Sequence, residues 1–152
     1  MKVLSRLALL IVACLFSQSA WSADSASKVD IKILIRTMNR MDYDGSKNEL
    51  LKKYNVRFAN IGQVVKILEC FDEDKAKIIA LRNFKFTSLS PMQIEKILEC
   101  FDKDKSKHEV FKDIRKSLDK SSINQIKNQF EAILNTFDED ATKSTVMDII
   151  LS

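Results

Sequence analysis

Apolar side chains recur at helical spacing along most of this chain, and the same arrangement returns at a fixed interval. In each copy, apolar residues at i, i+3, i+4 and i+7 form one stripe, and a shorter stripe follows after a polar interruption. A strand would need apolar residues at every second position, and that alternation is absent. The pattern therefore predicts four pairs of short helices, each with one buried face. The first stripes hold Leu34, Met38 and Met41, with Thr37 as the single lapse, then Val64, Ile67, Leu68 and Phe71, then Ile94, Ile97, Leu98 and Phe101, and finally Phe130, Ile133, Leu134 and Phe137.

A short acidic segment, which we call the corner, separates the two stripes of every copy. Its order is an apolar residue, Asp, any residue, Asp, any residue, a small residue and Lys. The first three corners are 30 residues apart and the fourth follows after 36, a period typical of stacked helical repeats. One such hairpin cannot bury its own apolar face, so we expect all four to fold together. The aspartates of successive corners are Asp42 and Asp44, Asp72 and Asp74, Asp102 and Asp104, and Asp138 and Asp140, and the lysines are Lys47, Lys77, Lys107 and Lys143.

Residues that favour helix starts lie twelve positions before the first three corners: Asp30, Asn60 and Ser90. Their side-chain oxygens can accept backbone N–H groups of a first helical turn. Gln63 and Gln93 stand three residues after Asn60 and Ser90, where a capping box needs an amide side chain. These residues predict where the first helix of each copy begins.

The fourth copy carries six extra residues before its corner, and they fit a polar connection over residues 119–122. Ser122 and Gln125 again have the spacing of a capping pair. We therefore expect an all-α fold of four tandem helix-turn-helix hairpins, about eight short helices of about eleven residues each. The pattern leaves open whether these hairpins stack as a right-handed array or curl into a bundle.

The composition supports a helical domain and argues against a nucleic-acid partner. The chain has 152 residues, enough for one domain with a core, and only two Gly and one Pro. Its formal net charge of +4 includes Lys2 and Arg6. Without these two, 23 basic residues (25 − 2) face 21 acidic ones, a net charge of +2. No clustered basic face of the kind that binds nucleic acid is indicated.

The first 22 residues have the order of a secretory signal peptide. Lys2 and Arg6 form a positive start, residues 7–16 are apolar, and residues 20–22 offer a cleavage site. Ten apolar residues are too few to span a bilayer, so we expect no stable membrane insertion. A short polar linker over 23–29 and a single helical domain over 30–152 would follow. The predicted location is secreted or periplasmic, and the alternative is a lipoprotein anchored through Cys14, since residues 11–14 resemble a lipobox.

The corner carboxylates have three interpretations. In the one we favour, the first Asp ends one helix and the second caps the next. In another, the Lys of one hairpin meets the Asp of its neighbour, which would build a ladder of exposed ion pairs. Calcium is the third, because Asp102, Asp104 and Ser106 occupy loop positions one, three and five, but Lys107 stands where a calcium loop needs Gly. We expect structural corners, with no metal and no cofactor.

The two cysteines of the predicted domain, Cys70 and Cys100, occupy the same position in adjacent copies. An oxidising compartment would favour a disulfide, but equivalent positions on neighbouring helices are about 8–10 Å apart, more than a disulfide spans. The alternative is two partly buried thiols. His108 is the one histidine and has no second ligand or nucleophile of matching spacing, so we expect no enzyme.

The corners resemble those of the domain of unknown function 4476 family, which occurs in exported proteins. Residues 71–75 and 101–105 match the Phe-Asp-x-Asp-Lys corner of that family fully, whereas the last copy has Ala141 after its second Asp. The resemblance covers residue 55 to the end, and residues 30–54 form an additional unit assigned from the internal period. It implies a helical fold and an export route, but no reaction and no ligand.

Two functions are compatible with these expectations. The first is a secreted, non-catalytic protein-interaction module that presents a repeat-built surface to an unidentified protein. The second is a carrier of a small apolar ligand held between helices, suggested by nine Phe in a modest domain. Most of these Phe lie at repeat-equivalent core positions, which favours packing. The sequence does not determine the oligomeric state.

Overall fold

The computed structural model describes residues 30–56 and 59–152. This part of the chain is all-helical and contains no strand, which confirms the predicted fold class. The predicted signal peptide, the polar linker over 23–29 and the lipobox cysteine Cys14 lie outside the described residues. The helices are α2 (Ile31–Met38), α3 (Asp44–Tyr54), α4 (Ile61–Leu68), α5 (Asp74–Leu81), α6 (Pro91–Leu98), α7 (Asp104–Ser117), α8 (Lys120–Asn128), α9 (Glu131–Leu134) and α10 (Asp140–Leu151).

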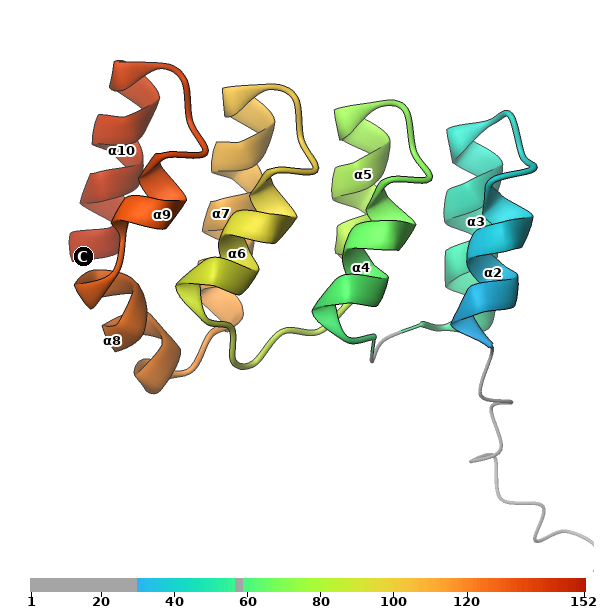
Figure 1. Cartoon of the computed structure of the whole chain (residues 1–152), viewed down its shortest axis with the longest axis horizontal. Helices are drawn as coiled ribbons and strands as arrows, with labels where there is room; N and C mark the ends of the chain where they lie inside the picture. The colour runs from blue at the N-terminus through green and yellow to red at the C-terminus, as the bar shows by residue number, and fades with distance from the viewer. Residues whose placement is uncertain (1–29, 57–58) are drawn as a thin grey trace, which may run out of the picture.

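Four helical hairpins stand side by side in a row (Figure 1). We number them from the N-terminus: hairpin 1 is α2 and α3, hairpin 2 is α4 and α5, hairpin 3 is α6 and α7, and hairpin 4 is α9 and α10. The extensive helix contacts of the described part join successive hairpins, α2 with α4, α4 with α6 and α6 with α9, and likewise α3 with α5, α5 with α7 and α7 with α10. The first and last hairpins lie at opposite ends of the row. The hairpins therefore form an open array rather than a closed bundle.

The predicted helix starts are confirmed in the first three hairpins. The side chain of Asp30 accepts the N–H of Lys32, and Asn60 and Ser90 form complete capping boxes with Gln63 and Gln93. Each of these side chains satisfies a backbone donor that the first helical turn leaves unpaired. The first helices are eight residues long, shorter than expected, because each ends before the corner begins.

The fourth copy differs from its prediction. The six extra residues do not form a polar connection but contribute to a further helix, α8, whose N-cap is Asp119 rather than Ser122. Ser122 is buried inside α8, where its hydroxyl accepts the N–H of Leu89 and lies 3.1 Å from the hydroxyl of Ser88. The proposed capping pair of Ser122 and Gln125 is therefore wrong, because Asp119 caps the helix and the Ser122 hydroxyl bonds to the loop between α5 and α6. The first helix of hairpin 4, α9, shrinks to four residues.

The core runs through the whole row between the helices. Nearly all residues of the predicted stripes are buried, and the exceptions lie mainly in the two outer hairpins. Thr37, the polar lapse of the first stripe, is exposed, whereas its equivalents Ile67, Ile97 and Ile133 are fully buried. Phe130 and Leu134 at the other end are only partly buried. The apolar stripes thus join hairpins to each other, and the outermost stripes have no neighbour on one side.

Candidate functional site: the polar junctions between hairpins

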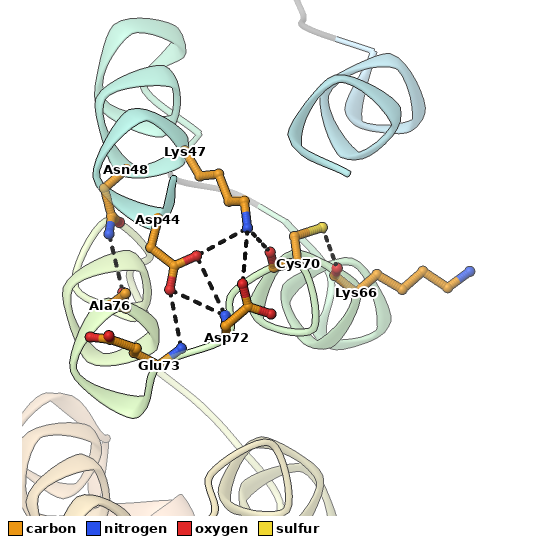
Figure 2. A network of polar contacts seen from close by, with 8 residues as sticks. All are labelled: Asp44, Lys47, Asn48, Lys66, Cys70, Asp72, Glu73 and Ala76. Atoms are coloured by element: carbon orange, nitrogen blue, oxygen red, sulfur yellow. Dashed lines mark hydrogen bonds and ion pairs between the residues drawn. The ribbon is translucent and has the colours of Figure 1, made fainter. Parts of the chain in front are cut away.

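A polar junction connects each of the first three corners to the corner of the next hairpin. In the first one, the carboxylate of Asp44 accepts the backbone N–H groups of Asp72 and Glu73 at 3.1 Å each. The ammonium of Lys47 lies 3.0 Å from the same carboxylate and donates to the carbonyl oxygen of Cys70 at 2.7 Å. Figure 2 shows these contacts converging from α3 onto the corner of hairpin 2. One Asp and one Lys on a single helix face therefore bind both donors and an acceptor of the neighbouring backbone.

The same junction occurs twice more. Asp74 accepts the N–H groups of Asp102 and Lys103 at 3.0 Å each, and Lys77 donates to the carbonyl of Cys100 at 2.8 Å. In the third junction, Asp104 accepts the N–H groups of Asp138 and Glu139 at 2.9 and 2.7 Å, and Lys107 donates to the carbonyl of Thr136. The recurring Asp and Lys of the sequence are thus the residues that fasten one hairpin to the next.

The local sequence explains why Asp and Lys act together. The Asp is the first residue of its helix and the Lys lies three residues later, so both side chains project from the same face. The groups that they bind have no other helical partner, because each first helix has ended and the second has not yet begun. Lys47, Lys77 and Lys107 are 4–8% exposed, so their ammonium groups depend on these acceptors.

This arrangement corrects the predicted role of the corners. Asp42, Asp72, Asp102 and Asp138 lie between helices, as expected. The second aspartates, however, do not cap their own helices, because the N-cap residues are Tyr43, Glu73, Lys103 and Glu139, and none makes a side-chain capping bond. The carboxylates of Asp44, Asp74 and Asp104 bind the next hairpin instead.

The ion-pair ladder considered from the sequence is present only in part. Lys47 lies 3.8 Å from Asp72 of the next hairpin, but the Asp72 side chain is 87% exposed. The closer partners of the corner lysines are backbone carbonyls and the aspartates of their own helices. A backbone carbonyl carries no sequence signature, which is why the residue pattern did not reveal this partner.

The junctions lower the pKa of two carboxyl groups. Partial burial alone would raise the pKa of Asp74, but the N–H groups of Asp102 and Lys103 outweigh it and hold that pKa below its usual value. Burial likewise opposes ionisation of Asp44, and the N–H of Glu73 together with Lys47 still lowers its pKa. Both carboxyl groups are therefore ionised acceptors at neutral pH.

The two cysteines are free thiols in the structure. Cys70 donates its S–H to the carbonyl of Lys66, and Cys100 donates to that of Lys96. Burial, joined by the negative charge of Glu69, raises the pKa of Cys100 to about 11, and burial also raises the pKa of Cys70. Their carbonyl oxygens, rather than their sulfur atoms, take part in the junctions. The disulfide was one of two alternatives left open by the sequence, and the structure holds the thiol form.

In the described part of the chain, no hairpin packs beyond the last corner. The side chain of Asp140 is fully exposed and that of Lys143 is 37% exposed, and they lie 3.8 Å apart. At the other end of the row, no carboxylate of the described residues bonds to the corner of hairpin 1. The junction contacts are therefore formed three times. At one end of the described array the corner of hairpin 1 has no such contact, and at the other end Asp140 and Lys143 have none.

The lateral face of the array carries a repeated charge pattern. Arg36, Lys66 and Lys96 occupy the same position on α2, α4 and α6, and all three are exposed. Glu69 and Glu99 follow three residues later, also exposed. A groove of about 580 Å³ between α4 and α6 is lined by Lys96 and both glutamates. This face offers regularly spaced charges above an apolar floor.

No metal-binding cluster is present among the described residues, and no helix there is long and apolar enough to cross a membrane. The buried Nε2 atom of His108 makes no hydrogen bond. The most apolar hollow found, lined by Phe84, Phe86, Val110 and Ile114, has a volume of about 240 Å³ and is open to solvent.

Comparisons with protein-family models, with curated proteins and with solved structures return no match. The resemblance to the domain of unknown function 4476 family therefore stays a prediction that rests on the Phe-Asp-x-Asp-Lys corners.

Proposed function

We propose that this protein is an exported, non-catalytic interaction module that binds another protein along the lateral face of its helical array. The observation that supports this is the periodic row of exposed charges at Arg36, Lys66 and Lys96, flanked by Glu69 and Glu99. An open array repeats the same surface at each hairpin, so a partner can engage several copies at once. Rim charges of this kind steer association and select the partner.

Packing does not explain these lateral charges. Exposed ion pairs contribute only about 0–1 kcal/mol to folding. Within the described residues, these basic side chains form no ion pair with the flanking glutamates. By contrast, the buried Asp and Lys of the junctions have clear structural roles. The lateral charges are thus available to a partner.

Native mass spectrometry of the protein purified from its source tests this proposal. A copurifying polypeptide is expected, and the double variant Lys66→Glu/Lys96→Glu should lose it. The double variant Lys75→Glu/Lys105→Glu is the matched control, because these lysines are exposed on α5 and α7, away from the lateral face. Retention of the polypeptide by the first variant, or equal loss from both, would contradict the assignment of this face.

The alternative function is transport of a small apolar ligand. The hollow lined by Phe84 and Phe86 supports it, but at about 240 Å³ this hollow is smaller than the 300–1,000 Å³ typical of ligand pockets. In the same mass spectrum, a bound lipid-like mass without a polypeptide would favour the carrier over the interaction module.

A further inference from the structure

The array has two unlike ends that complement each other. We call the outer side of hairpin 1 the leading end and the outer side of hairpin 4 the trailing end; they lie at opposite extremes of the row (Figure 1). Inside the array, each Asp-Lys pair faces the corner of the next hairpin. The trailing end carries such a pair without a corner, and the leading end carries a corner without such a pair.

The leading end presents the backbone groups that a junction binds. The N–H groups of Asp42 and Tyr43 are equivalent to those of Asp72 and Glu73, which bind Asp44. The carbonyl of Arg40 is equivalent to that of Cys70, which binds Lys47. Within the described residues these three groups of hairpin 1 have no hydrogen-bond partner.

The trailing end presents the side chains that bind those groups. Asp140 is the first residue of α10 and Lys143 lies three residues later, the arrangement of Asp44 and Lys47 on α3. In the internal junctions the Asp side chains are 6–16% exposed at Asp104 and Asp44, whereas that of Asp140 is fully exposed. Asp140 and Lys143 thus have the same arrangement as the internal Asp-Lys pairs, but they bind no corner.

Apolar residues accompany the polar groups at both ends. Leu50 is partly buried and Tyr54 is 41% exposed, yet their equivalents Ala80 and Phe84 are buried inside the array. At the trailing end, Leu134 is partly buried, whereas its equivalent Leu98 is fully buried. Each end therefore keeps part of the apolar surface that joins hairpins internally.

We propose that a second copy of this chain docks onto the first, head to tail, with Asp140 and Lys143 of one copy bound to the corner of hairpin 1 in the other. The contact continues the interface that the chain already forms three times between its own hairpins. It joins two different surfaces, so it adds copies in one direction and does not close at a dimer unless the array curves into a ring.

One polar substitution makes this contact weaker than the internal ones. Thr37 replaces the isoleucine that hairpins 2, 3 and 4 bury at that position. Two separate chains also lose translational and rotational freedom that the tethered hairpins do not. The association is therefore concentration-dependent rather than permanent.

Sedimentation equilibrium of a chain starting at residue 23, from about 10 µM to about 1 mM, tests the proposal, since about 1 mM is the weak limit of useful affinity. The mean mass is expected to rise continuously above that of one chain. Asp140→Lys blocks the trailing end, and Thr37→Arg, at an exposed position, blocks the leading end. Each variant alone should therefore abolish the rise in mean mass. Thr145→Lys is the control on the same helix, because Thr145 is exposed and its equivalent Glu109 contacts the preceding hairpin, so this variant should leave the rise unchanged.

Mixing the two blocked variants gives the sharpest result. Asp140→Lys keeps a free leading end and Thr37→Arg keeps a free trailing end, so the mixture should form a dimer that neither variant forms alone. A single-chain mass at every concentration, an unchanged rise in either blocked variant, or no dimer in the mixture would overturn the proposal. These outcomes do not bear on the proposed lateral partner, because a chain that does not self-associate can still bind that partner.

Discussion

At the scale of single residues, the corner carboxylates act between hairpins and not within one. Asp44, Asp74 and Asp104 each accept two backbone N–H groups of the following corner. Hydrogen bonds to an ionised acceptor are stronger than neutral ones, and an unpaired buried donor is costly. These three residues therefore have more effect on stability than exposed aspartates do.

Asp74→Asn should lower the free energy of unfolding by about 1–2 kcal/mol, because an amide oxygen replaces a charged acceptor for two donors. Asp140→Asn is the matched control, since the exposed Asp140 binds no backbone N–H group, and it should change stability by less than about 0.5 kcal/mol. Urea denaturation of the two variants and the parent measures both. Equal effects would mean that the junction carboxylate has no special role.

Acid should weaken the array through the same groups. The pKa values of Asp44 and Asp74 are lower in the folded chain than the value of 3.8 expected when unfolded. Their contribution is therefore fully present above about pH 4 and is lost as pH falls from there through the lower folded pKa values. Thermal unfolding between pH 6 and pH 2 should show a loss of stability in this range that is smaller in Asp74→Asn. An identical pH profile in the variant would contradict the assignment.

The cysteines should react slowly as thiols. With its pKa raised to about 11, Cys100 holds about 100-fold less thiolate at pH 8 than a thiol with the usual pKa of 9.0. Ellman's reagent should thus label a folded chain starting at residue 23 slowly and label both thiols rapidly in urea. An absence of thiols in urea would show that Cys70 and Cys100 are joined by a disulfide.

At the scale of helices, the sequence predicted the starts better than the lengths. Asn60, Ser90 and their glutamines have local signatures, and the structure shows both capping boxes. The start of α8 was misplaced because the Ser122 hydroxyl, which was interpreted as a cap, bonds instead to the loop between α5 and α6, a contact between residues 33 positions apart. Local spacing cannot contain such information.

Ser90→Ala should destabilise the protein by about 1 kcal/mol, because it removes the acceptor for the N–H of Gln93 at the start of α6. Ser144→Ala, in the exposed middle of α10, should be neutral or slightly stabilising, since Ala favours helices. Chemical denaturation compares them directly. A neutral Ser90→Ala variant would show that the capping box has no energetic role.

At the scale of the whole molecule, the period and the apolar stripes predicted four cooperating hairpins, but not their open arrangement. Both an array and a bundle bury the same stripes. The array follows from the partners of Asp44, Asp74 and Asp104, since each carboxylate must reach the next corner along the row. Those partners are backbone groups, which have the same chemistry at every position and so cannot be recognised in a sequence.

The central claim is that Asp-Lys pairs fasten the corners of hairpins 2, 3 and 4 to the preceding hairpin, and amide hydrogen exchange tests it most directly. In a dilute chain, the N–H groups of Asp72, Glu73, Asp102, Lys103, Asp138 and Glu139 should exchange slowly, as helical core amides do. The N–H groups of Asp42 and Tyr43, which have no carboxylate partner in the described structure, should exchange orders of magnitude faster. Equal and rapid exchange of all eight amides would contradict the claim.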